Sequence, residues 1–243
     1  MKTLLASKEV KLFNSLSNLL SKNYNYKVIK SDNFLYAEGE IPIGIVAHVD
    51  TVYKEPPNII FHDADLKVMW SPLGLGADDR AGVFAILKLL QKGYRPTVII
   101  TRGEEKGGIG AYELISKIPK NDSLKFLIQL DRSGFDDAVF YDCDNKEFEK
   151  YITGFGFNTE FGTFTDISII APVWGIAAVN LSVGYLNEHS DIEHWFYDSC
   201  HETIEKVGWI LDDVAINSVH RFKYIPCKKR KWSFYAEQNA GTV

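Results

Sequence analysis

Apolar side chains follow two patterns along the chain: a spacing of three or four positions, and short continuous runs. Where they recur every three or four positions, one face of the segment is apolar, and the spacing predicts an amphipathic helix. The predicted helices cover residues 9–20, 79–91, 108–118, 145–152 and 191–217. Asp144 is expected to cap the fourth of these helices, because a short acidic side chain is favoured at a helix N-terminus.

Short, continuous apolar runs separate these helices, and the run at residues 43–47 is rich in β-branched residues. Such runs are typical of strands that are buried on both faces. They cover residues 43–47, 98–101, 124–130 and 176–183, and weaker strands are expected at residues 26–29, 34–37, 59–61, 66–70 and 138–141. Strands that alternate with helices predict an α/β fold, with a mostly parallel central sheet in a three-layer αβα arrangement.

The composition limits the kinds of partner. The chain has 243 residues, of which 46% are hydrophobic and 24% are charged. These values predict one globular domain over residues 1–243, with a C-terminal tail from about residue 222. The net charge of −5 argues against a nucleic-acid partner. No apolar run approaches the roughly 20 residues of a membrane span, so no membrane partner is expected.

Cysteine usage indicates the compartment. Cys143, Cys200 and Cys227 are widely spaced and form neither a disulfide framework nor a CxxC metal-binding pair. The first residues also lack the apolar core of a signal peptide. We therefore expect a reducing, cytoplasmic setting. The pattern predicts no particular oligomeric state.

Carboxylates and histidines follow the predicted strands in a regular order. They are His48 and Asp50, Asp78 and Asp79, Glu104 and Glu105, Asp131, and His189. Taken singly, each has an ordinary alternative: a turn, a helix cap, a solvated loop or a loop histidine. Because ligands gather at the carboxyl ends of parallel strands, we expect these side chains to meet. Imidazole and carboxylate donors together are typical of a site for two zinc-like ions, and one carboxylate can bridge both ions.

Two of these clusters indicate a division of roles. His48 and Asp50 lie two residues apart on an extended segment and point to the same side, so Asp50 is placed to orient the imidazole. Glu104 and Glu105 are adjacent and point in different directions, so one can bind a metal while the other faces the bound water. A carboxylate in that position can accept the proton of the water and pass it to a leaving amine.

The sequences around these residues resemble the zinc exopeptidase clan of M20, M28 and M42 metallopeptidases. Three motifs carry the resemblance: HxDT at residues 48–51, DDxAG at residues 78–82 and EExGxxGA at residues 104–111. Leu130-Asp131 and residues 187–193 follow in the family's order, so the likeness spans most of the chain. It implies a phosphorylase/hydrolase-like zinc-peptidase catalytic domain that cleaves a peptide or an N-acyl amino acid at an amide bond.

The resemblance also implies a role for each residue. The roles are Asp78 as the bridging ligand, His48 and Asp131 as terminal ligands, Glu105 and His189 as the ligands that complete the second metal, Glu104 as the general base, and Asp50 as the residue that orients His48. Asp78 is preferred to Asp79 because the bridging Asp of the family lies four residues before a helix glycine, here Gly82. Zinc fits these donors best, and cobalt or manganese would also fit.

One difference from the M20 enzymes concerns their lid domain. Those enzymes insert a lid between the fourth ligand and the last histidine, and the lid supplies a histidine that stabilises the oxyanion. Here Asp131 and His189 lie only 58 residues apart, which is too few for a lid. We therefore expect a lidless domain, more like M28, whose oxyanion donor is a nearby side chain. Tyr141 and Tyr185 are the candidates.

The substrate class stays open at this point. An aminopeptidase, a di- or tripeptidase and an N-acyl amino-acid deacylase all use the same core. A site for a terminal carboxylate would need an arginine, and Arg80, Arg102 and Arg132 are near the predicted site. A non-catalytic binding module that keeps the fold is the main rival, although it has no need of Glu104 as a base. The basic run at residues 228–231 is more typical of a solvated tail than of a nucleic-acid site.

Overall fold

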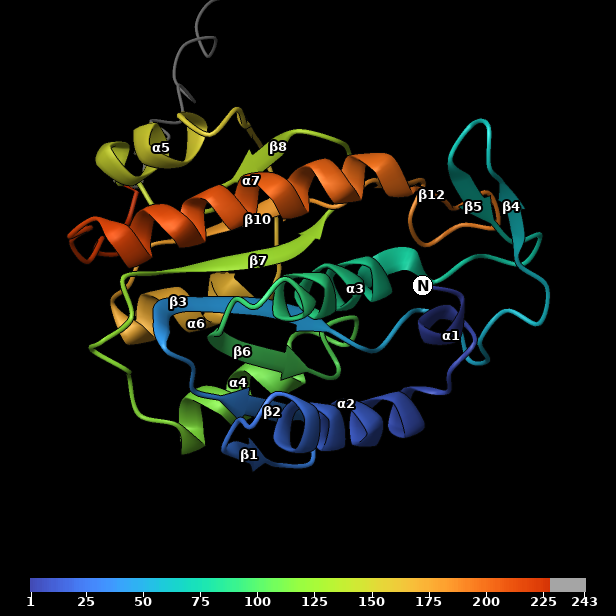
Figure 1. Ribbon diagram of the computed structural model, residues 1–243, viewed down its shortest axis with the longest axis horizontal. Helices are drawn as coiled ribbons and strands as arrows, with labels where there is room; N and C mark the ends of the chain where they lie inside the picture. Colours follow the sequence, from blue (N-terminus) through green and yellow to red (C-terminus); the bar gives the residue numbers. More distant parts are fainter. Residues whose placement is uncertain (228–243) are drawn as a thin grey trace, which may run out of the picture.

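The computed structural model describes residues 1–227, so the basic run at residues 228–231 and the rest of the predicted tail lie outside the described residues. An eight-stranded sheet forms the centre of the molecule (Figure 1). In spatial order its strands are β1 (Val28–Lys30), β2 (Phe34–Ala37), β6 (Pro96–Thr101), β3 (Ile41–His48), β7 (Phe126–Arg132), β10 (Ala178–Ser182), β8 (Asp137–Val139) and β9 (Asn158–Glu160).

The middle of this sheet is parallel, as predicted. β6, β3, β7 and β10 pair in parallel, whereas β1, β2 and β8 pair antiparallel to their inner neighbours. Every residue of β6 is buried, and β3 is buried from Ile43 onward. This burial explains why these strands are continuous apolar runs rather than alternating ones.

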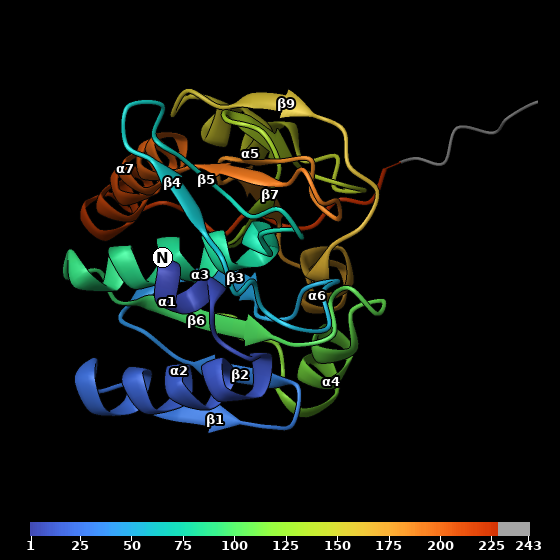
Figure 2. The ribbon, with the colours of Figure 1, turned by 90° about the vertical axis from the view of Figure 1, so that its right-hand side faces the viewer.

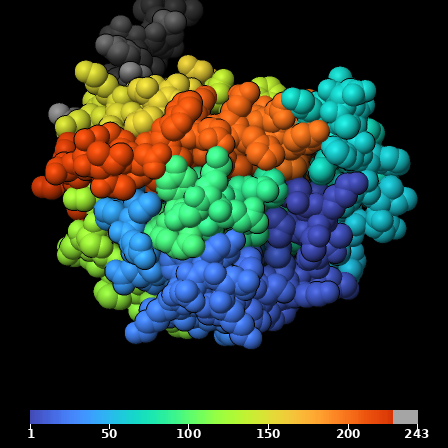
Figure 3. Space-filling model, viewed as in Figure 1, coloured from blue at the N-terminus to red at the C-terminus, as the bar shows by residue number. Residues whose placement is uncertain are grey.

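Helices cover both faces of the sheet. One face is covered by α2 (Glu9–Asn23), α3 (Ala77–Gln91) and α7 (Tyr197–Ile216), whose apolar sides share one core cluster. The other face is covered by α4 (Ile109–Lys117) and α6 (Asp166–Trp174), which contribute to a second cluster. Figure 2 shows the two helical layers on opposite sides of the sheet, and Figure 3 shows α7, α3 and α2 side by side on one face. The predicted three-layer αβα fold is therefore confirmed.

Two shorter helices complete the helical part of the described chain. α1 (Lys2–Leu5) precedes α2, and α5 (Lys146–Thr153) lies between β8 and β9. Asn145, and not Asp144 as predicted, is the N-cap of α5, and its side chain accepts a hydrogen bond from the backbone N–H of Phe148. Both side-chain types can cap a helix, so the sequence pattern did not separate them.

A small antiparallel sheet lies beside the carboxyl ends of the central strands, at the right of Figure 1. Its strands, in spatial order, are β11 (Tyr185–Leu186), β12 (His194–Phe196), β5 (Val68–Trp70) and β4 (Phe61–Asp63). The loop between β11 and β12 carries His189. The small sheet therefore holds one of the predicted ligands close to the ends of the central strands.

The small sheet also corrects one predicted helix. The stretch 191–217 was expected to be helical throughout, but α7 begins only at Tyr197. The residues from His194 to Phe196 form β12 instead. Trp195 is buried, and its indole N–H donates a hydrogen bond to the carbonyl of Val183. Pairing with β5 and burial of this indole outweigh the helical spacing of the sequence.

Three elements between Asp131 and His189 were not predicted: the strands β9 and β11 and the helix α6. α6 is apolar on most sides and contains Pro172, so it lacks a clear helical period. The main sheet and its helical layers take up most of this interval, and β11 belongs to the small sheet. The expected absence of an inserted lid therefore agrees with the fold.

No helix within residues 1–227 has both the length and the apolar character of a membrane span. The single domain over residues 1–243 stays a prediction.

Candidate active site

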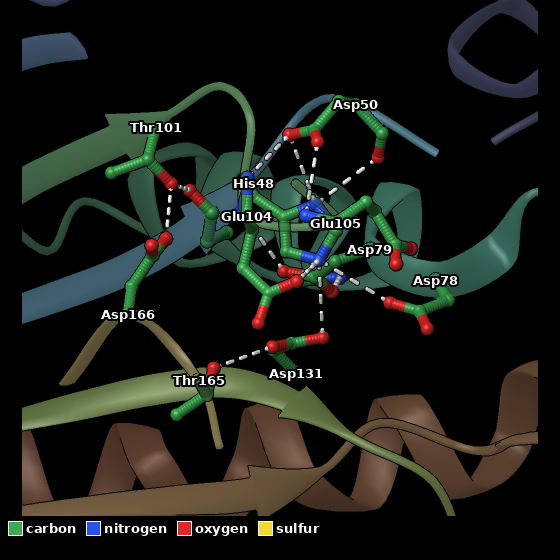
Figure 4. A network of polar contacts seen from close by, with 12 residues as sticks. His48, Asp50, Asp78, Asp79, Thr101, Glu104, Glu105, Asp131, Thr165 and Asp166 are labelled. Atoms are coloured by element: carbon green, nitrogen blue, oxygen red, sulfur yellow. Dashed lines mark hydrogen bonds and ion pairs between the residues drawn. The ribbon is translucent and has the colours of Figure 1, made fainter. Parts of the chain in front are cut away.

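The residues singled out in the sequence meet at the carboxyl ends of the central strands. His48 ends β3, Asp131 lies near the end of β7, the two glutamates follow β6, Asp78 lies in the first turn of α3, and His189 follows β11. Figure 4 shows the acidic side chains gathered around the ring of His48. Asp78, Glu104, Asp131 and His189 line a pocket of about 200 Å³.

The ring of His48 lies within this cluster and is only 1% exposed. Its Nε2 atom lies 3.3 Å from Oδ1 of Asp78 and 3.5 Å from Oδ1 of Asp131. The buried strand β3 fixes the position of this ring, because the strand ends at His48. One imidazole nitrogen and two carboxylate oxygens therefore converge at one point.

Asp78 takes part in a second group of donors through its other oxygen. Its Oδ2 atom lies 3.1 Å from Nε2 of His189. The same nitrogen of His189 lies 3.1 Å from Oε1 of Glu105. Asp78 thus contacts His48 with one oxygen and His189 with the other, so its carboxylate joins the two groups.

The spacing of these donors fits zinc-like ions. Ligands at about 2.0 Å from a tetrahedral zinc ion lie roughly 3.3 Å from one another. The contacts described for the two groups measure 3.1 to 3.5 Å. Imidazole nitrogen and carboxylate oxygen are donors that zinc, cobalt and manganese accept. The residues present therefore fit a pair of divalent ions that share Asp78.

Asp50 links the ring of His48 to the loop that carries the two glutamates. Its Oδ1 atom lies 3.4 Å from Nδ1 of His48, and its carbonyl oxygen lies 3.1 Å from the same nitrogen. The carboxylate also accepts hydrogen bonds from the backbone N–H groups of Glu104 and Glu105. The contacts of Asp50 therefore fix both the ring orientation and the position of the loop.

Asp131 is held by hydrogen bonds from three side chains, one on β7 itself and two from other parts of the fold. Oδ2 accepts from Gln129 Nε2 at 3.0 Å and from Thr165 Oγ1 at 2.8 Å. Oδ1 accepts from the hydroxyl of Tyr185 at 3.1 Å. Tyr185 was one of the two expected oxyanion donors, but its proton is directed to Asp131. This hydrogen bond makes Tyr185 a residue that orients a carboxylate.

Crowding of buried carboxylates changes their protonation. Burial raises the pKa of Glu104 to about 9; His48 opposes the rise, and the negative charge of Asp131 adds to it. Burial also raises the pKa of Glu105 to about 7 and that of Asp166 to about 7. Buried acids that favour their neutral forms indicate a shortage of positive charge, which a divalent cation would supply.

The acidic neighbours favour the protonated forms of both histidines. Burial alone lowers the pKa of His48. The charge and hydrogen bond of Asp131, together with hydrogen bonds to Asp50 and Asp78, outweigh burial and raise this pKa well above its ordinary range. The hydrogen bond with Asp78 raises the pKa of His189 to about 9. A ligating imidazole must be neutral, so metal binding is expected to release protons.

A buried glutamate fixes the segment that carries Asp78. Glu193 is 0% exposed, and its carboxylate accepts hydrogen bonds of 2.7 to 3.1 Å from four consecutive backbone N–H groups. These N–H groups belong to residues 75–78, at the start of α3, where a helix leaves its donors without partners. Glu193 lay within the motif stretch 187–193, but nothing in the sequence showed that it would contact residues more than a hundred positions away.

Replacement of Glu193 by Ala is expected to destabilise the protein, because four buried donors lose a charged acceptor. We expect a loss of about 3–5 kcal/mol in the free energy of unfolding, equivalent to a fall of roughly 10 °C in Tm. Thermal unfolding followed by circular dichroism measures the change. Glu202→Ala, on the exposed side of α7, is the matched control, and an equal Tm for the two variants would show that Glu193 does not stabilise the start of α3.

The second Asp of the pair has a different environment from the first. Asp79 accepts hydrogen bonds from the backbone N–H groups of His48 at 3.2 Å and Gly82 at 2.8 Å. A Cβ atom at Gly82 would lie 2.0 Å from the carbonyl oxygen of Leu130, so this position requires glycine. The Asp79 carboxylate therefore joins α3 to β3, while Asp78 faces the two histidines.

Tyr141, the other expected oxyanion donor, lines the pocket. Its hydroxyl accepts a hydrogen bond of 2.9 Å from Nδ2 of Asn180. The Asn180 amide also accepts from the backbone N–H of Asp131 and donates to its carbonyl. Because Asn180 is a donor to the hydroxyl, the Tyr141 proton stays available. Asn180 thus positions the phenol of Tyr141 relative to β7. The sequence pattern around Asn180 did not indicate this role.

The sequence matches no family model and no curated relative, but solved structures share its fold. A tripeptidase from Staphylococcus aureus subsp. aureus Mu50 matches with a TM-score of 0.73 and 18% identity, covering 88% of this chain and 96% of that one. The aminopeptidase PepT from Bacillus cereus ATCC 10987 matches with a TM-score of 0.70 and 16% identity, covering 88% and 96%.

A third match extends the likeness to an archaeal protein. A TET aminopeptidase from a marine sediment thaumarchaeon matches with a TM-score of 0.68 and 12% identity, covering 87% of this chain and 95% of that one. At such low identities the likeness concerns the fold. The chain therefore has the fold of these aminopeptidases, in agreement with the resemblance of its motifs to the zinc exopeptidase clan.

Proposed function

We propose that this protein is a hydrolase with two divalent metal ions and that it removes residues from short peptides as an exopeptidase. Zinc is the proposed metal, and cobalt or manganese would fit the same donors. The observation that carries the proposal is the position of Asp78, whose two oxygens contact His48 and His189 separately. Two groups of donors joined by one carboxylate suit a pair of ions. The aminopeptidases and tripeptidase that share the fold support the choice of peptide substrates.

The proposed chemistry divides between the ions and the side chains. Bound ions would polarise the scissile carbonyl and lower the pKa of the attacking water. His48, Asp78 and Asp131 would hold one ion, and Asp78, Glu105 and His189 the other. Glu104 lines the pocket and Glu105 contacts His189, so the two glutamates have separate tasks.

Glu104 is the proposed general base. Its carboxylate accepts a proton from the attacking water and then donates it to the departing nitrogen. The carboxylate of Asp50 contacts Nδ1 of His48, and this contact directs Nε2 of the ring toward Asp78 and Asp131. Tyr141 donates a hydrogen bond to the oxyanion that develops on the scissile carbonyl, a task for which its free proton is suited.

Tyr141→Phe tests this assignment of the oxyanion donor. We expect kcat to fall by about 100-fold with little change in KM, because the hydrogen bond forms only as charge develops on the carbonyl. Metal content is expected to stay at the wild-type value. Tyr112→Phe, on an exposed position of α4, is the control. Steady-state kinetics of both variants measure the effect, and an unchanged kcat for Tyr141→Phe would remove this tyrosine from the mechanism.

A substrate panel combined with metal analysis tests the proposed function. The panel contains aminoacyl, dipeptide, tripeptide and N-acyl amino-acid substrates, each assayed with the metal-loaded protein and after chelation. Peptide hydrolysis that is lost on chelation and restored by zinc supports the proposal. Activity on N-acyl amino acids alone would assign the protein as a deacylase. No bound metal and no turnover would instead favour a binding module that keeps the fold.

A further inference from the structure

A single arginine projects from the end of β7 beside the proposed catalytic residues. Arg132 directly follows Asp131 and lines the same pocket as Glu104 and Tyr141. Its Nε atom is buried and has no hydrogen-bond partner. Within residues 1–227, no carboxylate forms a salt bridge with its guanidinium, whereas Arg102 pairs with Glu9. Arg132 is therefore a cation without a salt-bridge partner in a pocket that several carboxylates also line.

The other two arginines near the site are already engaged. Arg80 donates hydrogen bonds to the carbonyls of Leu4 and Ser7. Arg102 donates to Glu9 and to the carbonyl of Asp32. Neither lines the pocket that Glu104 lines. Of the three arginines considered from the sequence, only Arg132 is placed to meet a substrate.

The chemistry of a guanidinium indicates the substrate group that would bind there. Its planar fork of N–H donors matches a carboxylate, and a buried donor without a partner is costly. Burial raises the pKa values of Asp137 and Tyr141, and the nearby charge of Arg132 opposes that rise. Within residues 1–227, however, Asp137 forms no salt bridge with Arg132. An incoming carboxylate would give Arg132 the partner that the protein does not provide.

We propose that Arg132 binds the free C-terminal carboxylate of the substrate and so restricts the enzyme to short peptides. The inference rests on the proposed function and deepens it. A pocket of about 200 Å³ is smaller than a typical site for a drug-sized ligand, which agrees with a substrate of two or three residues. Because Arg132 is adjacent to Asp131, the bound carboxylate lies only a short distance from the scissile bond.

The test compares a tripeptide with its C-terminal amide. Trialanine and trialanine amide differ only in the charge of the terminus, so the ratio of their kcat/KM values reports carboxylate recognition. We expect the metal-loaded wild type to prefer the acid by about 100-fold, as suits a charge-assisted, desolvated ion pair. In Arg132→Met the ratio should fall to about one, mainly through KM for the acid. Arg132→Lys should give an intermediate ratio, because an ammonium lacks the fork.

The ratio is measured on one preparation, so partial loss of folded protein affects both substrates equally. Arg221→Met is the matched control, because Arg221 pairs with Asp122 before the start of β7, at the end of the sheet away from the pocket. It should keep the wild-type ratio. Equal rates for acid and amide in the wild type, or an unchanged ratio in Arg132→Met, would overturn the inference. An unchanged ratio with a lowered Tm would show that Arg132 acts structurally, through Asp137.

Dissociation constants measured without turnover distinguish a failure of this inference from a failure of the proposed function. Isothermal titration calorimetry with the metal-loaded Glu104→Gln protein measures the dissociation constants of trialanine and its amide without turnover. We expect the acid to bind about 100-fold more tightly, and the additional change Arg132→Met to abolish the preference. If the wild type hydrolyses no peptide but the preference is present, the proposed function fails and the inference stands. If peptides are hydrolysed and neither assay shows a preference, only the inference fails.

Discussion

Glu104→Gln is expected to lower kcat by about 1,000-fold while metal content stays unchanged, because a general base contributes about 100- to 10,000-fold to the rate. The amide has nearly the shape of the carboxylate but cannot accept the proton of the attacking water. Glu104 contacts His48 only at 3.9 Å and lines the pocket, so the substitution leaves the two donor groups that share Asp78 intact. Steady-state kinetics and metal analysis on the same sample measure the two quantities.

Glu205→Gln, which lies on α7 and pairs with Lys92 at the surface, is the matched control for this substitution. It should keep the wild-type kcat. If Glu104→Gln kept kcat within a few fold of the wild type, Glu104 would not be the base. If it lost its metal as well as its activity, Glu104 would act as a ligand, and the division of tasks between Glu104 and Glu105 would be wrong.

Asp78→Asn is expected to disrupt binding of both ions, because one oxygen of Asp78 contacts His48 and the other contacts His189. We expect metal affinity to fall by more than about 100-fold, which is the upper range for loss of an outer-shell partner. Turnover should then be undetectable at ordinary metal concentrations. Competition with a fluorescent chelator measures the affinity. By contrast, Glu105→Ala removes the carboxylate that contacts His189 and should mainly lower the occupancy of the position next to His189.

The neighbouring Asp provides a control that the sequence motif alone could not supply. Asp79→Asn should lower Tm, because the Asp79 carboxylate accepts two backbone N–H groups. It should retain metal, because that carboxylate faces the backbone of β3 and α3 rather than the histidines. Loss of metal in Asp79→Asn with retention in Asp78→Asn would reverse the assignment of the bridging ligand.

The location of the site was predictable from the sequence for a physical reason. Strands buried on both faces are continuous apolar runs, and their ends are marked by the first polar residues. His48 and Asp131 lie at such ends, and parallel pairing of β3 with β7 brings them within 3.5 Å. The helix α3, which carries Asp78, was predictable from the three- and four-residue spacing of its apolar side chains. Local pattern was therefore enough to place the residues that end strands.

The contacts that orient these residues were not predictable, because they join segments that are distant in sequence. Asn180 holds Asp131 across 49 positions, and Glu193 holds the backbone of Asp78 across 115 positions. The strand β12 was taken for helix for the same reason, since only its pairing with β5 distinguishes it. The spacing of apolar residues within one segment gives no information about which distant segment it contacts.

The most direct test of the two-metal site is anomalous diffraction at the zinc absorption edge from crystals of the zinc-loaded protein. Two anomalous peaks are expected beside Asp78, one next to His48 and Asp131 and the other next to Glu105 and His189. Absence of any peak at Asp78 in zinc-loaded crystals, or a single ion bound without Asp78, would contradict the proposed two-metal site.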